Sequence, residues 1–61
     1  MTQNLTEKEA AQLLRVSVRT VQDWRQRGCG PSYLKLGKAV RYPTEQVEAY
    51  MAKSLISPPT M

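Results

Sequence analysis

The stretch Ser17-Val18-Arg19-Thr20-Val21-Gln22-Asp23-Trp24-Arg25-Gln26-Arg27-Gly28 carries a complete helix signal. Ser17 is a favourable N-cap, and Gly28 stands where a glycine commonly follows a helix, so residues 18–27 are predicted to be helical. Apolar residues recur at Val18, Val21 and Trp24, which gives this helix one face for a core. Arg25 lies near that face, and we expect its aliphatic stem to pack there.

A second helix is predicted just before this one. Thr6 and Glu9 have the spacing of a capping box, so the helix is expected to run from Glu7 to about Arg15. Ala10, Leu13 and Leu14 fall on its core side, with Ala11 at the edge. Because only Val16-Ser17 separates the two helices, they must cross steeply, as in a helix-turn-helix.

Residues 33–42 are predicted to form a β-hairpin, because 33–36 and 40–42 alternate like strands around Gly37-Lys38-Ala39. A two-residue loop would set Lys35 opposite Val40 and mix polar with apolar side chains. A three-residue loop pairs Leu36 with Val40 and Leu34 with Tyr42, and we predict this register. The side chains expected to face the helices are then Leu34, Leu36, Val40 and Tyr42. Those expected to face outward are Lys35 and Arg41, with Lys38 at the tip.

Pro43-Thr44-Glu45 opens a third predicted helix, with Thr44 as its cap. Its apolar face is predicted to hold Val47, Tyr50, Met51 and Ser54, with Leu55 at the edge. The fold class is therefore mainly α with a small β-hairpin: a winged helix-turn-helix in the order helix, helix, hairpin, helix. Residues 1–55 are expected to form this one domain, and residues 56–61, which contain two prolines, a flexible C-terminal tail.

Charge is concentrated in the middle of the chain. The 61 residues carry a net charge of +4, but residues 15–42 hold seven Lys and Arg against Asp23 alone, a net of +6. Such a field suits a polyanion. Surplus lysine on a solvated face is the alternative explanation, so the placement of the charges has to decide.

Several function classes are excluded by composition. The chain has no His and a single cysteine, Cys29, so neither an internal disulfide nor a Cys/His metal cluster forms. We expect Cys29 to be half-buried, no cofactor to be bound, and the protein not to be an enzyme, because Cys29 has no base partner. The apolar runs are too short for a bilayer and no signal peptide is visible, which predicts a cytosolic protein without membrane contact.

The polar side of the helix over residues 18–27 carries side chains suited to reading bases: Arg19, Gln22, Asp23 and Gln26. The DNA backbone is expected to meet Ser17, Thr20 and Arg27. The hairpin is expected to present Lys35, Lys38 and Arg41 as a wing. Each group also has a structural explanation: an exposed helix face is polar in any case, Ser17 caps its helix, and lysines protect edge strands.

The order of elements resembles the small excisionase-type DNA-binding family. The resemblance covers about residues 5 to 53 and rests on Leu5-Thr6-Glu7-Lys8-Glu9-Ala10-Ala11, Val16 to Val21, Trp24-Arg25, Arg27-Gly28, the tract from Gly30-Pro31 to Tyr42, and Glu45 to Tyr50. The chain is also similar to the N-terminal winged-helix module of MerR-type regulators. It ends before the long dimerisation helix of those regulators, so we do not expect an effector-sensing dimer.

The resemblance implies a phage or mobile-element excisionase, a recombination directionality factor that bends DNA and directs an integrase toward excision. It implies as partners double-stranded DNA with attachment-site repeats, the phage integrase, and neighbouring copies of the protein bound cooperatively. The expected location is the cytoplasm of a bacterial host, at the nucleoid. Two alternatives stay open: a prophage transcriptional regulator with the same module, and a protein-binding adaptor.

Overall fold

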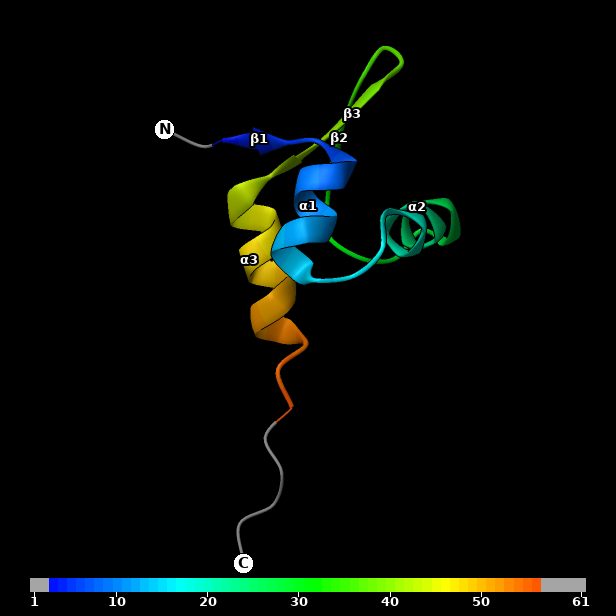
Figure 1. Cartoon of the computed structure of the whole chain (residues 1–61). Coiled ribbons are helices and arrows are strands. Elements are labelled where there is room, and N and C mark those ends of the chain that lie inside the picture. The colour runs from blue at the N-terminus through cyan, green and yellow to red at the C-terminus, as the bar shows by residue number, and fades with distance from the viewer. Residues whose placement is uncertain (1–2, 57–61) are drawn as a thin grey trace, which may run out of the picture.

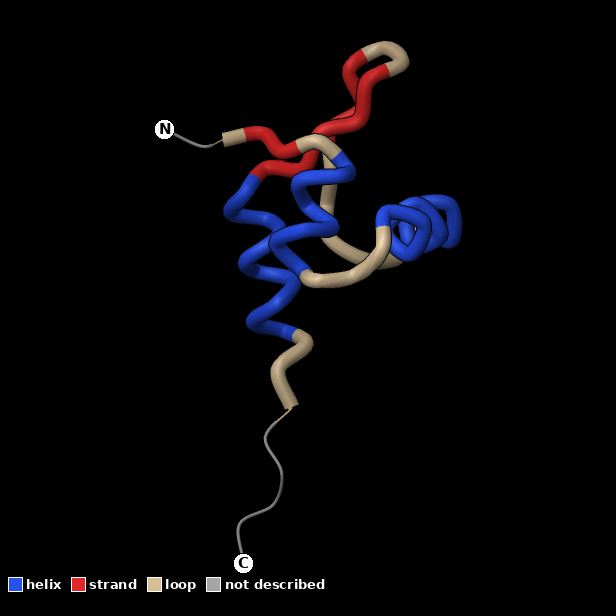
Figure 2. Tube along the Cα trace, in the orientation of Figure 1, coloured by secondary structure: helices blue, strands red, loops and turns tan. Residues whose placement is uncertain are grey.

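The computed structural model describes residues 3–56, which form three helices and three short strands joined by loops. In chain order they are β1 (Asn4–Leu5), α1 (Glu7–Leu14), α2 (Val18–Arg27), β2 (Leu34–Leu36), β3 (Ala39–Pro43) and α3 (Thr44–Lys53). Helices α1 and α3 lie side by side, α2 stands to one side of them, and the β2–β3 hairpin projects beyond the helices (Figure 1, Figure 2). The predicted winged helix-turn-helix is confirmed. Of the predicted tail, residues 57–61 lie outside the described residues.

Helix α1 begins with the predicted capping box. The Thr6 amide donates to Glu9 Oε1 at 2.9 Å, and the Glu9 amide donates to Thr6 Oγ1 at 3.1 Å. The helix ends at Leu14, with Arg15 as a left-handed C-cap at φ 60°. Ala10 and Ala11 are buried, whereas Leu13 is 42% exposed, so its expected place in the core is wrong. The buried arc is centred between the two alanines, and Leu13 lies about 110° from that centre at 100° per residue.

Helix α2 has the predicted bounds. Ser17 caps its N-terminus by accepting a hydrogen bond from the Thr20 amide at 3.1 Å, and Gly28 is a left-handed C-cap. Val21 is fully buried, and Val18 packs partly buried against the core. Trp24 is half-buried and places its ring 5.5 Å from that of Tyr50 in α3. The apolar face of α2 therefore fixes it against both α1 and α3.

The hairpin register differs from the prediction. The paired residues are Leu34 with Arg41, Lys35 with Val40, and Leu36 with Ala39, so Gly37-Lys38 is a two-residue loop. Gly37 has φ 64°, and among the described residues Arg15 is the only non-glycine with positive φ. A hairpin turn with positive φ at its first position alone is type II′, which takes glycine there. The expected three-residue loop is wrong because the position of this glycine selects the shorter turn.

The observed register redistributes the side chains of the hairpin. Directly paired residues share a face of the sheet, so Lys35 lies on the side of Val40 and Tyr42, which pack into the core. Leu34 and Leu36 lie on the opposite side, 41% and 56% exposed, and do not face the helices as expected.

Strand β1 was not predicted from the sequence. It pairs antiparallel with β3, through Leu5 with Tyr42 and Asn4 with Pro43, and the sheet order is β1-β3-β2. The pairing continues at Gln3, whose carbonyl accepts from the Thr44 amide at 2.8 Å and from Thr44 Oγ1 at 2.9 Å.

Helix α3 begins at Thr44, with Pro43 at the N-cap and no side-chain capping bond. The predicted cap at Thr44 is therefore wrong, because its hydroxyl is used to hold the N-terminal strand. Val47 is fully buried, but Met51 is 43% exposed and Leu55 77% exposed. The core is small: Leu5, Ala10, Ala11, Val21, Tyr42 and Val47 are buried, with Leu14, Val16, Val18 and Val40 packed around them.

Candidate nucleic-acid interface

Helix α2 turns a polar face away from the core. Arg19, Asp23 and Gln26 are exposed on it, and Gln22 is half-buried at its edge. Gln22 and Asp23 lie three and four residues after Arg19, and Gln26 lies four and three residues after them, so a single helix brings all four onto the side away from Val21. Arg pairs with guanine, Gln with adenine, and Asp accepts from cytosine or orients a neighbouring Arg. The face therefore has the chemistry for contact with base edges.

The N-terminus of α2 presents a pair of hydroxyls. Ser17 Oγ lies 2.8 Å from Thr20 Oγ1, and it also accepts from the Thr20 amide. The two hydroxyls carry two protons, and the bond between them uses one. The other proton is left for an acceptor outside the pair, at the end of the helix where its dipole favours an anion. Capping by Ser17 and a contact with phosphate are therefore compatible.

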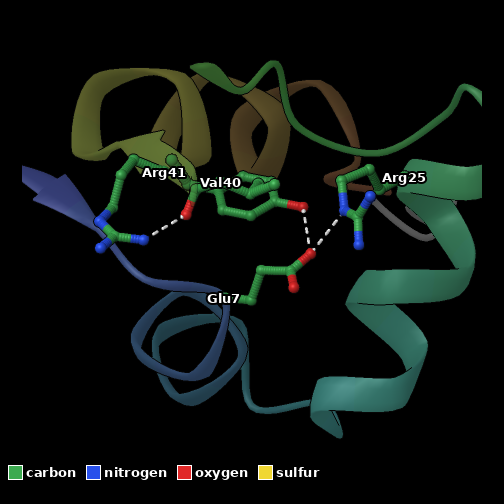
Figure 3. Close-up of polar contacts among 5 residues, drawn as sticks. Glu7, Arg25, Val40 and Arg41 are labelled. Atoms are coloured by element: carbon green, nitrogen blue, oxygen red, sulfur yellow. Dashed lines mark hydrogen bonds and ion pairs between the residues drawn. The ribbon is translucent and has the colours of Figure 1, made fainter. Parts of the chain in front are cut away.

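The hairpin places its cations differently from the expected wing. Lys35 is exposed, and Lys38 is exposed in the loop at the tip. Arg41 is half-buried, and its Nη1 donates to the Val40 carbonyl oxygen at 2.8 Å (Figure 3). Because the loop has two residues, Lys35 and Arg41 lie on opposite faces of the hairpin, and their expected common outer face is wrong. Lys35 thus lies on the face that holds Val40 and Tyr42, and Arg41 lies on the face that holds Leu34 and Leu36.

A polar cluster missed by the sequence analysis connects α2 to the sheet. Glu7 Oε2 accepts from Arg25 Nε at 2.7 Å and from the Tyr42 hydroxyl at 3.3 Å, so one oxygen joins α1, α2 and β3 (Figure 3). The Glu7 and Arg25 side chains are 17% and 25% exposed. The sequence predicts only that the stem of Arg25 packs near the core, and it predicts no partner for Glu7. The position of Arg25 on the core side of α2 was the signal that it needed an anionic partner.

The electrostatics of this cluster favour a charged Arg25 and a neutral Tyr42. The hydrogen bond to Glu7 is the main cause that raises the pKa of Arg25 above its ordinary value, against the opposing effect of burial. Burial, with a smaller contribution from the Glu7 carboxylate, raises the pKa of Tyr42 to about 12. At neutral pH Tyr42 therefore keeps its proton and donates a hydrogen bond to the Glu7 carboxylate, which is also paired with Arg25. This cluster links α2 to β3.

The segment from the end of α2 through the hairpin carries only positive charges. Between Trp24 and Thr44 the sequence contains no Asp or Glu.

In residues 3–56 no group of three or more acidic, Cys or His side chains is placed to hold a metal ion, and no helix there has both the length and the apolar character of a membrane span. Cys29, expected to be half-buried, is exposed in the loop after α2. The expectation is wrong because the loop packs inward through Gly30, which lies against Trp24, and through the buried Pro31, and not through Cys29.

Fold and surface together define a winged helix-turn-helix protein with an exposed polar face on α2. Residues 5–54 match the model of the helix-turn-helix domain family, and the chain belongs to that family. Neither the curated proteins nor the solved structures gave a match to the chain. Membership of this family supports sequence-specific binding of double-stranded DNA.

Proposed function

We propose that this protein binds and bends double-stranded DNA as an excisionase, and directs an integrase toward excision of a phage or other mobile element. The observation that carries the proposal is the exposed polar face of α2 next to a projecting basic hairpin, in a region without acidic residues after Asp23. The resemblance of residues 5–53 to excisionase-type proteins supports the recombination role. The proposal gives the protein no catalytic step and no cofactor.

In the proposed complex α2 lies in the major groove. Arg19 pairs with guanine, Gln22 and Gln26 contact adenine, and Asp23 accepts from cytosine or orients Arg19. Contacts to the sugar-phosphate backbone come from the helix ends and the hairpin, and position the helix without reading sequence. The residues proposed for them are Ser17, Thr20 and Arg27 in and beside α2, and Lys35, Lys38 and Arg41 in the hairpin.

The small size of the module leads us to propose several copies on one DNA. One domain of this kind neutralises few phosphates, so its affinity at physiological salt is limited. Neighbouring copies that bind cooperatively to repeats in the attachment region increase the occupancy without a larger domain. The proposed partners are therefore attachment-site DNA, adjacent copies of the protein and the phage integrase, at the nucleoid of the bacterial host.

A salt series of DNA binding tests this function. The protein is titrated onto a random-sequence duplex and onto the attachment region of its element, at several salt concentrations. Steep salt dependence with a tighter complex on attachment DNA, which fills in one cooperative step, supports the excisionase. Tight binding only at a promoter identifies a transcriptional regulator with the same module. Absence of any salt-dependent binding contradicts DNA binding and leaves a protein-binding adaptor.

A further inference from the structure

Leu34 and Leu36 form an apolar pair on the hairpin that its cations do not explain. The observed register turns both side chains to the face opposite Val40 and Tyr42, where they are 41% and 56% exposed. The hairpin projects beyond the helices, so this face is open to a partner (Figure 1). Two leucines side by side on a projecting element expose apolar surface that a binding partner is suited to cover.

The charges around the apolar pair favour DNA as that partner. Arg41 is paired across the hairpin with Leu34 and shares its face, and Lys38 follows Leu36 by two residues at the tip. No acidic residue occurs between Trp24 and Thr44, so the charges that the hairpin itself contributes to the rim of the pair are all positive. Phosphates complement such a rim. A second copy, with five Asp and Glu against nine Lys and Arg, complements it less well than DNA does.

The orientation of the hairpin relative to α2 indicates which groove the pair faces. Tyr42 shares a face with Lys35, and through Glu7 its hydroxyl is joined to Arg25 of α2. Lys35 therefore lies on the face of the hairpin toward α2, and the apolar pair lies on the other. In the proposed complex, with α2 in the major groove, Lys35 would face the phosphates that border this groove. The leucine face of the hairpin would then point past those phosphates, toward the adjoining minor groove.

We propose that Leu34 and Leu36 enter this minor groove as an apolar wedge, contact the deoxyriboses, partly unstack one base step, and so bend the duplex. Apolar side chains inserted from the minor groove kink DNA in this way and bend it toward the major groove. The proposal rests on the proposed DNA binding and adds to it the groove, the residues and the origin of the bend. Arg41 and Lys38 hold the flanking phosphates.

The test compares the double variant L34S/L36S with the control L13S, which removes a leucine of similar exposure, 42%, from α1. The probe is a duplex selected from a random-sequence library, with dyes at both ends so that energy transfer reports the bend. We expect L34S/L36S to bind this duplex roughly tenfold more weakly than the unmodified protein does, because two apolar side chains are no longer buried on binding. Its bend is expected to be smaller and its salt slope unchanged, because no charge is removed. L13S is expected to match the unmodified protein.

A change in the DNA identifies the groove. Inosine in place of guanine in the segment flanking the α2 site removes the amino group from the minor groove and leaves the major-groove acceptors in place. Removal of that polar group lowers the cost of burying leucine there. We expect inosine to tighten binding of the unmodified protein and to leave the affinity of L34S/L36S unchanged.

Three outcomes overturn the wedge. If L34S/L36S binds and bends DNA as the unmodified protein does, the leucines are not a wedge, and the proposed function is unaffected. Normal binding of one copy with loss of the second makes the leucines a contact between proteins. Failure of the unmodified protein to bind DNA overturns the proposed function as well. Circular dichroism checks that the double variant is folded, and if it is not, the single variant L36S at the more exposed position carries the same expectations.

Discussion

Arg25 of α2 donates from Nε to Oε2 of Glu7 in α1 across 2.7 Å, and these two residues lie 18 positions apart in the chain. The same carboxylate oxygen receives the hydroxyl of Tyr42 from β3. A single carboxylate thus links α2 to β3, in addition to the apolar contacts that hold α2 against α1 and α3.

Replacement of Glu7 by Gln is expected to lower the free energy of unfolding by about 1–2 kcal/mol, because a partly buried charged hydrogen bond becomes a neutral one. Urea unfolding measures this change. DNA affinity is expected to fall as well, since α2 and the hairpin lose their common anchor. The exposed Glu48 in α3 provides the matched control, and Glu48→Gln is expected to stay within about 0.5 kcal/mol. Equal effects of the two substitutions would contradict the role of Glu7.

Stability is expected to fall at high pH through Tyr42. Its pKa is raised from 10 to about 12, so the folded protein keeps a proton that the unfolded chain loses. The stabilisation is complete below pH 10 and is lost as the pH rises toward 12. Chemical unfolding across this range measures the loss of stability, and this loss is expected to be smaller in the Tyr42→Phe variant. The Tyr33→Phe variant, which removes a 40% exposed phenol, is expected to lose as much stability as the unmodified protein. A pH profile that Tyr42→Phe leaves unchanged would refute this assignment.

Alanine at Gly30 is expected to destabilise the fold more than alanine at Gly28. Both glycines have positive φ, 86° and 76°, so each substitution incurs a backbone cost of about 1–2 kcal/mol. A Cβ at Gly30 would lie 2.9 Å from Trp24 Cβ, whereas one at Gly28 meets no atom within 4 Å. Overpacking therefore adds roughly 1–3 kcal/mol at Gly30 alone. Thermal unfolding followed by Trp24 fluorescence separates the two, and equal losses would exclude the steric contribution.

Glycine at Arg15 is expected to stabilise the protein. Arg15 has φ 60° at the end of α1, where its amide donates to the Ala11 and Gln12 carbonyls. Removal of Cβ relieves the left-handed strain, and the greater freedom of the unfolded chain offsets part of the gain, which leaves roughly 0.5–1 kcal/mol. The melting temperature should rise by a few degrees. Arg15→Ala keeps Cβ and is the control; a matching rise there would show that charge, and not φ, is responsible.

Arg19 and Lys38 are expected to differ in what their loss does to DNA binding. Arg19→Ala should relax base preference at one position at a cost of about 1–3 kcal/mol, whereas Lys38→Ala should weaken all sequences alike and reduce the salt slope by about one. Selection from a random duplex library and a salt series measure these two effects. Equal, sequence-independent losses in both variants would argue against placement of α2 in the major groove.

The elements with local signals could be predicted from the sequence. The capping box at Thr6 and Glu9, the N-cap at Ser17 and the glycine after Arg27 each act within four residues, and they set the starts of α1 and α2 and the end of α2 correctly. Because the polar face of α2 follows from helical spacing alone, its residues lie together as expected. Whether they read bases remains a prediction.

The features that failed depend on contacts between distant segments. Strand β1 has two residues, too few for an alternating pattern, and exists because β3 pairs with it. Burial of Leu34 and Leu36 favours a three-residue loop, but the turn at Gly37 determines the register of the hairpin instead. Leu13 was assigned to the core from periodicity, which does not show on which side of α1 the other helices pack.

The pairing of Leu5 with Tyr42 has a consequence for biosynthesis. The ribosome makes the partner of β1 only after both helices of the helix-turn-helix, so the sheet closes late and long-range contacts have to form last. Until residues 39–44 emerge, Glu7 lacks Tyr42 and Gln3 lacks Thr44. A nascent chain that ends within the hairpin therefore already contains α2 but lacks the polar link between α2 and β3, which forms only once Tyr42 is available.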